Sequence, residues 1–145
     1  MEEGIPVALD VEGSGVAGRI VGRFRLVRLI GEGGMSSVYA AERSDDFRQI
    51  AAVKLLREEL CDAETRLRFR AERQVLASLQ HPNIVQLIDG GLTQDGVPYL
   101  IMDYVEGEPL DKYCDRRRIS LRERLQLMIA VLDALEYAHQ HFVAH

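Results

Sequence analysis

The sequence predicts an α+β fold, in which an antiparallel β-sheet of about five strands carries one helix and is followed by further helices. Two observations lead to this class. Short strand-like runs, the first of them with a period of two, lie between residues 24 and 105 and are interrupted by one segment of helical periodicity. Two helical segments then follow. The 145 residues are 47% apolar and 28% charged, which indicates one folded domain or part of a larger one.

Charge and cysteine content argue against several kinds of protein. With 18 basic and 23 acidic residues the net charge is −5, so we expect no nucleic-acid partner and no membrane contact within this chain. Cys61 and Cys114 lack the spacing of a zinc site or a disulfide framework, and we expect no metal site among the residues present. The apolar run 127–132 is too short to span a bilayer, so the expected location is the cytoplasm.

The first elements are strands that follow a flexible leader. Residues 1–18 mix glycine, acidic and small residues without periodicity, which predicts the leader. Phe24 to Ile30 alternates apolar and basic residues, which is typical of a strand with one solvent-exposed face. Val38 to Ala41 is strand-like again, so the glycines between the two runs predict a hairpin bend. Ile50 to Leu56 is a third strand, apolar except for one lysine.

A helix is predicted from about Ala63 to Leu79. Asp62 can cap it, because its carboxylate can accept hydrogen bonds from the free amides of the first turn. Glu72 is spaced so that it shares one face of this helix with Phe69, Leu76 and Leu79. A carboxylate among apolar side chains is costly unless a cation meets it, so the pattern predicts a partner for Glu72.

The second half continues with strands and then helices. His81-Pro82-Asn83 ends the helix, and 84–88 and 99–105 are the next strands. A short helix is expected over 110–117. Ser120 and Glu123 form a capping box, which predicts the start of a long helix. An apolar stripe with 3/4 spacing runs along that helix: Leu121, Leu125, Met128, Leu132, Leu135 and His139.

Three features together point to phosphate chemistry. Glycines between two strands let backbone amides approach phosphate oxygens, although such a hairpin alone is more often a simple turn. Lys54 alone is more often a solvent-facing lysine, and Glu72 alone could pair with Arg68 or Arg73 on its own helix. Neither a dinucleotide fingerprint nor a Walker loop is present. The glycine-rich hairpin, the lysine on a strand and the glutamate on a helix follow one another in the order that a shared site would need. This combination favours a joint role for the three.

These motifs resemble those of the protein kinase N-lobe, and their residues are similar to those of bacterial Ser/Thr kinases. Most of the chain is covered by the resemblance, from about residue 20 onward. One departure is Ser36 at the place of the third loop glycine. The matching segments, in order, are Gly31-x-Gly33-x-x-Ser36-x-Val38, Ala52-Val53-Lys54, Glu72, His81-Pro82-Asn83-Ile84-Val85 and Met102-Asp103-Tyr104-Val105.

The resemblance implies a role for each site residue. Lys54 would hold the α- and β-phosphates of ATP and pair with Glu72, and Met102 would be the gatekeeper. Main-chain groups of Asp103 and Val105 would meet the adenine edge. For the ribose, Glu108 and Asp111 are both candidates. Adenine would be enclosed by Ile30, Val38 and Ala52, and the phosphates would be covered by backbone amides of Gly31, Glu32, Gly33, Gly34, Met35, Ser36 and Ser37.

The resemblance also implies a division of the chain and its partners. Residues 1–18 would be the leader, 19–105 the N-lobe and hinge, and 106–145 the incomplete start of the C-lobe. The implied cofactors are ATP and Mg²⁺, and the implied substrate is a protein with Ser or Thr hydroxyls.

Residues 142–145 are similar to the lead-in to the family's His-Arg-Asp loop. The catalytic Asp and the Mg²⁺ ligands would then lie beyond His145, so we expect these 145 residues alone to be inactive. The leading hypothesis is part of an active kinase. Its rival is a short pseudokinase that acts as a nucleotide- or protein-binding regulatory module, and a third is a nucleotide-binding regulator unrelated to kinases.

Overall fold

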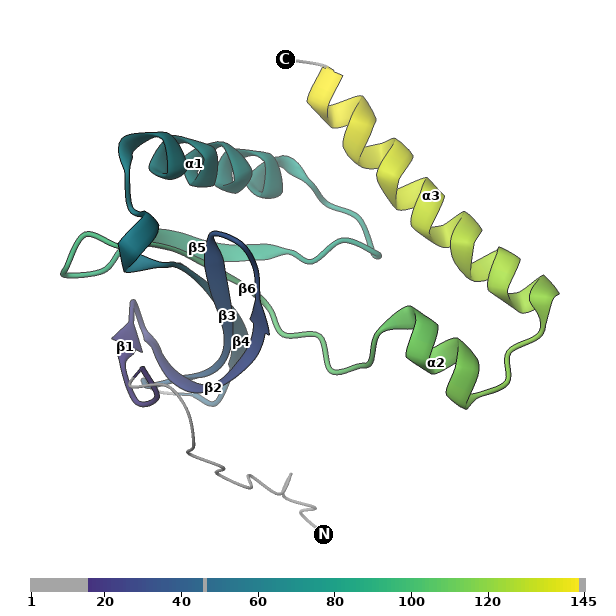
Figure 1. The fold of residues 1–145 in the computed structure, drawn as a ribbon, viewed down its shortest axis with the longest axis horizontal. Coiled ribbons are helices and arrows are strands. Elements are labelled where there is room, and N and C mark those ends of the chain that lie inside the picture. The colour runs from purple at the N-terminus through teal and green to yellow at the C-terminus, as the bar shows by residue number, and fades with distance from the viewer. Residues whose placement is uncertain (1–15, 46, 144–145) are drawn as a thin grey trace, which may run out of the picture.

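The computed structural model describes residues 16–45 and 47–143, which form a curled antiparallel sheet with a helix against it and two further helices beyond (Figure 1). The sheet has six strands in the order β1-β2-β3-β4-β6-β5. Its strands are β1 (Ile20–Val21), β2 (Phe24–Glu32), β3 (Ser36–Arg43), β4 (Ile50–Leu56), β5 (Leu87–Leu92) and β6 (Pro98–Asp103). The predicted α+β class is confirmed, and the two-residue β1 is the strand that the sequence pattern did not show.

The fifth strand differs from its predicted position at 84–88. At Ile84 the chain is still turning, because the Ile84 amide donates a hydrogen bond to the carbonyl of His81. β5 therefore starts at Leu87 and runs through Gly90 and Gly91, two residues that on their own suggest a turn. They suit the strand because β6 crosses closely: a methyl group at Gly90 would stand 3.1 Å from the Tyr99 carbonyl oxygen.

The core fills the inside of the curled sheet. Alternate residues at the start of β2 point into it, whereas β4 is buried on both faces except at Ile50 and Lys54. Its largest fully buried side chains are Leu26, Leu56, Leu100, Ile101, Val21 and Val53. The sheet is therefore a stable platform from which the side chains of its other positions project.

Helix α1 (Ala63–Ser78) follows the short 3₁₀ helix η1 (Glu58–Leu60) and lies beside β5 (Figure 1). The predicted cap is present, since the Asp62 carboxylate accepts a 2.7 Å hydrogen bond from the Thr65 amide. Phe69 is the buried residue of this helix and joins the sheet core. Burial of Phe69 fixes which face of α1 is turned to the sheet. It therefore also fixes which charged side chains of α1 point toward the sheet.

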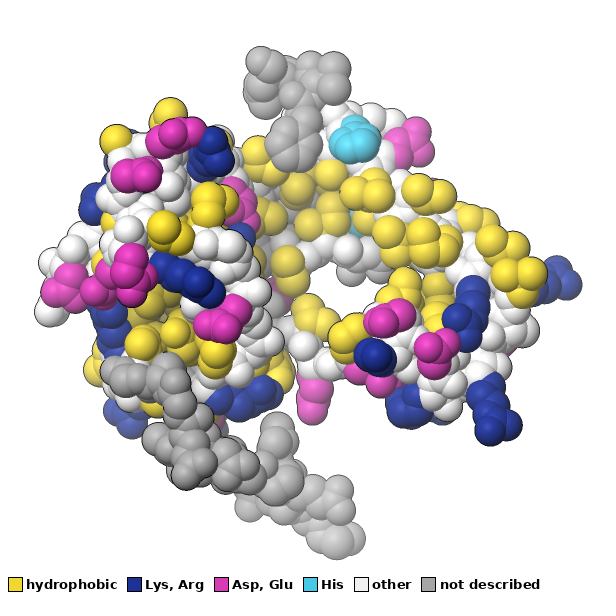
Figure 2. Space-filling view, viewed as in Figure 1, with side chains coloured by type: hydrophobic (Ala, Val, Ile, Leu, Met, Phe, Trp, Pro, Cys, Tyr) yellow, Lys and Arg dark blue, Asp and Glu magenta, His cyan; other side chains and the backbone are white. Residues whose placement is uncertain are grey.

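Helices α2 (Leu110–Arg116) and α3 (Leu121–Val143) follow the sheet. The capping box is present at the start of α3: the Ser120 amide donates to the Glu123 carboxylate at 3.0 Å. Apolar side chains gather along the face of α3 that is visible in Figure 2, and Leu121 and Leu125 of the predicted stripe are 74% and 56% exposed. Within the described ranges no helix combines the length and apolarity needed to cross a membrane.

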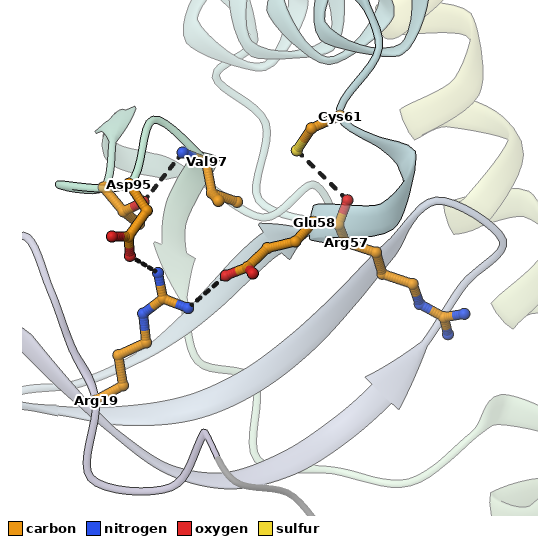
Figure 3. A network of polar contacts seen from close by, with 7 residues as sticks. Arg19, Arg57, Glu58, Cys61, Asp95 and Val97 are labelled. Atoms are coloured by element: carbon orange, nitrogen blue, oxygen red, sulfur yellow. Dashed lines mark hydrogen bonds and ion pairs between the residues drawn. The ribbon is translucent and has the colours of Figure 1, made fainter.

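A polar network ties the first described residues to the sheet (Figure 3). The Arg19 guanidinium donates to Glu58 at 3.1 Å and to Asp95 at 2.8 Å, so it joins η1 to the β5–β6 turn. Residues 16–18 of the predicted leader form a turn, and the Gly18 amide donates to the Leu26 carbonyl. The remaining leader residues, 1–15, and the final Ala144-His145 lie outside the described residues.

Candidate functional site

The candidate site is centred on an ion pair between the sheet and α1. Lys54 is the one charged position within the seven residues of β4, and its ammonium group donates to the Glu72 carboxylate. The two side chains are 23% and 39% exposed. The predicted cation partner of Glu72 is thus Lys54. Neither Arg68 nor Arg73 of α1 forms an ion pair with Glu72. A half-buried lysine with one carboxylate partner retains donors that a bound anion can reach.

The strand register places four predicted site residues on one face of the sheet. Val38 is opposite Lys54 in the β3–β4 ladder, and Ala52 is opposite Met102 in the β4–β6 ladder. Directly opposed residues point to the same side, and so do positions two apart on one strand. Val38, Ala52 and Met102 therefore form an apolar surface next to the Lys54 ammonium group.

The glycine-rich bend closes the β2–β3 hairpin beside this surface. Gly33 donates to the Ser36 carbonyl at 2.8 Å, so its amide serves the hairpin itself. The amides of Gly34 and Met35 donate to no acceptor among residues 16–45 and 47–143. Ser36 and Ser37 are buried within β3. Of the amides expected to meet phosphate, those of Gly34 and Met35 are the ones left open at the bend.

Two more predicted residues sit at the edges of this arrangement. Ile30 lies at an irregularity of the β2–β3 pairing, between the paired residues Leu29 and Gly31, and is 38% exposed. Glu32 pairs with Ser37 in the ladder, and its carboxylate lies 3.6 Å from the Arg57 guanidinium. Sequence reasoning missed Arg57, whose amide also donates to the Met35 carbonyl. The signal that could have pointed to Arg57 was its position directly after β4, opposite the glycine-rich bend.

The segment after β6 contains the remaining candidates. The Asp103 amide donates to the Gln86 carbonyl at 3.0 Å, so this amide is already engaged, and Val105 is 69% exposed. Of the two ribose candidates, Glu108 is already engaged by Arg116 at 2.9 Å. The hydrogen bond from Arg116 holds the pKa of the Glu108 carboxyl below its usual range. Asp111 lies in the first turn of α2.

The donor set fits an anion with an apolar ring and does not by itself fit a metal. An apolar strip beside an ammonium group and two open amides suits a nucleotide, because the flat faces of its base can pack on apolar side chains and its phosphates are anionic. Among the residues described there is no group of three His, Cys, Asp or Glu side chains that could hold a metal ion.

Comparisons with known proteins agree with this geometry. The family model of the protein kinase domain matches residues 24–145. The chain is 40% identical over 129 residues to serine/threonine-protein kinase PrkC of Bacillus subtilis and 41% identical over 132 residues to a probable serine/threonine-protein kinase of Streptomyces coelicolor. Each alignment covers 88% of this chain and 20% of the relative, so the chain spans a fifth of those proteins.

Solved structures give the same result. The crystal structure of the Mycobacterium tuberculosis PknI kinase domain is similar with a TM-score of 0.65 and 34% identity. That likeness covers 86% of this chain and 51% of the PknI domain. Sheet, helix and ion pair are consistent with the N-lobe of such a domain and the start of its C-lobe, and the chain belongs to the protein kinase family, among relatives that are bacterial serine/threonine kinases.

Proposed function

We propose that this chain is the ATP-binding portion of a protein Ser/Thr kinase. The observation that carries the proposal is the Lys54–Glu72 pair, located on the same face of the sheet as Val38, Ala52 and Met102. Adenine would lie against those apolar side chains. Its edge would meet the main chain of Asp103 and Val105, and the phosphates would lie toward Lys54 and the bend.

Each polar group then has a defined task. Lys54 binds the α- and β-phosphates, while Glu72 holds the ammonium group at that position. A lysine has three N–H donors, so pairing with Glu72 leaves donors for phosphate oxygens. The open amides of Gly34 and Met35 approach the phosphates without a charged side chain, as glycine-rich bends allow. Mg²⁺, when bound, would neutralise phosphate charge, and the described residues supply no ligand cluster for it.

Nucleotide binding by the chain tests the first part of the proposal. Titration with a fluorescent ATP analogue is expected to give saturable binding that ATP displaces. Lys54→Met should weaken it at least 10-fold, because the phosphate cation is removed. Lys112→Met is the matched control, since Lys112 is an exposed lysine of α2 that is not among the residues assigned to the site, and its affinity should be unchanged. Equal affinity for the two variants would refute the assignment.

We also propose that these 145 residues bind ATP without transferring its γ-phosphate to a protein hydroxyl. By resemblance, the Asp that orients the substrate hydroxyl follows the family's His-Arg-Asp histidine, and no such Asp occurs within the 145 residues. Incubation with radiolabelled ATP and a generic protein substrate should give no labelled protein. Labelling that disappears in Lys54→Met would contradict this part and leave the nucleotide-binding part intact.

A further inference from the structure

A hydrogen bond joins strand β2 to the segment that follows β6. The Arg28 guanidinium donates to the Tyr104 hydroxyl at 2.9 Å, across 76 positions of sequence. Arg28 precedes Ile30 by two residues on β2. Tyr104 stands between Asp103 and Val105. The bond therefore connects two segments to which the proposed site assigns contacts with adenine.

Arg28 belongs to the row of residues that carries the apolar surface of the site. In the strand ladders Arg28 is opposite Ala40, which is opposite Ala52, and Ala52 is opposite Met102. Directly opposed residues point to the same side of a sheet, so Arg28 projects from the face on which Ala52 and Met102 lie. The two alanines end in single methyl groups. The long Arg28 side chain thus stands at the β2 end of a row that is otherwise short as far as Met102.

Two irregularities of β2 flank Arg28 on either side. The β2–β3 register shifts between Leu26 and Arg28, and it shifts again between Leu29 and Gly31. An extra residue on one strand bends that strand, increases its twist and changes the direction of its side chains. The direction of the exposed Arg28 side chain is therefore set by two local bends in β2 and not by regular alternation alone.

The segment after β6 has few other contacts that hold it to the sheet. Asp103, the last residue of β6, is held on the β5 side, where its amide donates to the Gln86 carbonyl. No main-chain group of residues 104–107 bonds to another main-chain group in the part of the chain that the structure describes. Tyr104 is half-buried, whereas Val105 is largely exposed. The hydrogen bond from Arg28 to Tyr104 therefore ties this segment to β2.

We propose that Arg28 and Tyr104 are positioning residues for the base of the nucleotide, an inference that rests on the proposed ATP site. By holding Tyr104, Arg28 keeps the main chain of Asp103 and Val105 at a fixed separation from the apolar surface of the sheet. A site that already has the correct width loses less binding free energy to ordering of the protein. Without the bond a smaller fraction of molecules has that width, and the apparent affinity falls with that fraction. Neither side chain needs to touch ATP in this role.

Competition against a fluorescent ATP analogue, with the full 145-residue chain, tests the proposal. Arg28→Met removes the donor of the bond and Tyr104→Phe removes its acceptor. Each variant should weaken ATP and adenosine by the same factor, about 3- to 10-fold, which is the range of one hydrogen bond's net contribution. Inorganic tripolyphosphate should compete equally well in the variants and in the native chain, because the bond acts on the base and not on the phosphates.

Three further variants separate the bond from the residues that form it. Arg25→Met is the matched control, because Arg25 is an exposed arginine of the same strand that is not assigned to the site. It should keep the affinity for all three ligands. The double variant of Arg28→Met with Tyr104→Phe should bind adenosine as weakly as each single variant and no more weakly, because the same bond is lost in all of them. Arg28→Lys retains a donor and should recover part of the affinity.

The outcomes distinguish the positioning role from the nucleotide site itself. If ATP competes but Arg28→Met and Tyr104→Phe match the native chain, the positioning role is overturned and the nucleotide site stands. Additive losses in the double variant would overturn the positioning role too, since the two side chains would then act separately. An equal loss of tripolyphosphate binding would do the same, because the variants would then disturb the whole fold. Failure of the native chain to bind ATP would overturn the nucleotide assignment, and the positioning role with it.

Discussion

The ammonium group of Lys54 on β4 and the carboxylate of Glu72 on α1 form an ion pair across 18 positions of sequence. This pair links the helix to the face of the sheet on which Val38, Ala52 and Met102 lie. Because α1 is anchored to the core by Phe69 one turn earlier, Glu72 approaches Lys54 from a defined direction. Any change in the seating of α1 therefore changes the position of the Lys54 cation.

Removing the charge of Glu72 should weaken nucleotide binding without unfolding the chain. In Glu72→Gln the amide retains the shape of the side chain but no longer holds the Lys54 ammonium group by charge. We expect a 3- to 10-fold loss of ATP-analogue affinity. Glu64→Gln, on the same helix and paired with Arg68, is the control. Unchanged affinity in Glu72→Gln would show that Lys54 is positioned by other contacts.

The hydroxyl of Tyr137 connects α3 to the segment after α1. It accepts a 3.0 Å hydrogen bond from the Gln80 amide, and the ring lies beside His81 and His141, with centroids 5.2 Å and 4.0 Å away. Tyr137→Phe keeps these ring contacts and leaves the amide unpaired, so it should cost about 1 kcal/mol of unfolding free energy. Urea denaturation measures this. Tyr113→Phe is the control, and equal losses would argue against the bond.

Stability in acid should depend on the capping box of α3. The hydrogen bond from the Ser120 hydroxyl, followed by that from the Ser120 amide, keeps the pKa of the Glu123 carboxyl below its usual 4.5. A lowered pKa in the folded state means that the stabilisation is complete above pH 4.5 and is lost as pH falls through the folded-state pKa.

Far-UV circular dichroism measured from pH 6 to pH 3 tests this dependence. The native chain should lose more helix stability over this range than Glu123→Gln, whose side chain does not titrate. Parallel curves for the two proteins would show that other carboxylates account for the acid sensitivity. Ser120→Ala should reduce the difference as well, because it removes the first-named hydrogen bond.

Gly90 should not tolerate a side chain. The added methyl group of Gly90→Ala would stand 3.1 Å from the Tyr99 carbonyl oxygen and 3.2 Å from Cδ2 of Leu100, both in the neighbouring strand. We expect a loss of about 1–3 kcal/mol, the usual cost of overpacking. Gly34→Ala is the control, since a methyl group there meets nothing within 4 Å. Equal melting temperatures would contradict the close approach.

Local signals sufficed for much of this protein. The Asp62 and Ser120 caps, the apolar run of β4 and the 3/4 spacing of α1 are signals within a few residues, so the sequence determined these elements closely. The apolar stripe also predicted a cation partner for Glu72, the resemblance to the kinase N-lobe implied that this partner is Lys54, and the structure has that pair.

Other features depended on contacts between distant segments and were decided only by the tertiary structure. Gly90 and Gly91 resemble a turn in sequence, yet they lie in β5, where an added methyl group would stand 3.1 Å from the Tyr99 carbonyl oxygen at Gly90 and 3.0 Å from the Tyr99 hydroxyl at Gly91. The two-residue β1 exists only by pairing with β2. The pocket lined by Phe69, Leu92 and Tyr99 likewise requires α1, β5 and β6 to meet. Helix caps and periodicity involve residues that are close in sequence and can therefore be predicted from it. The close approach of two strands joins residues that are far apart in sequence, so it depends on how the strands pack.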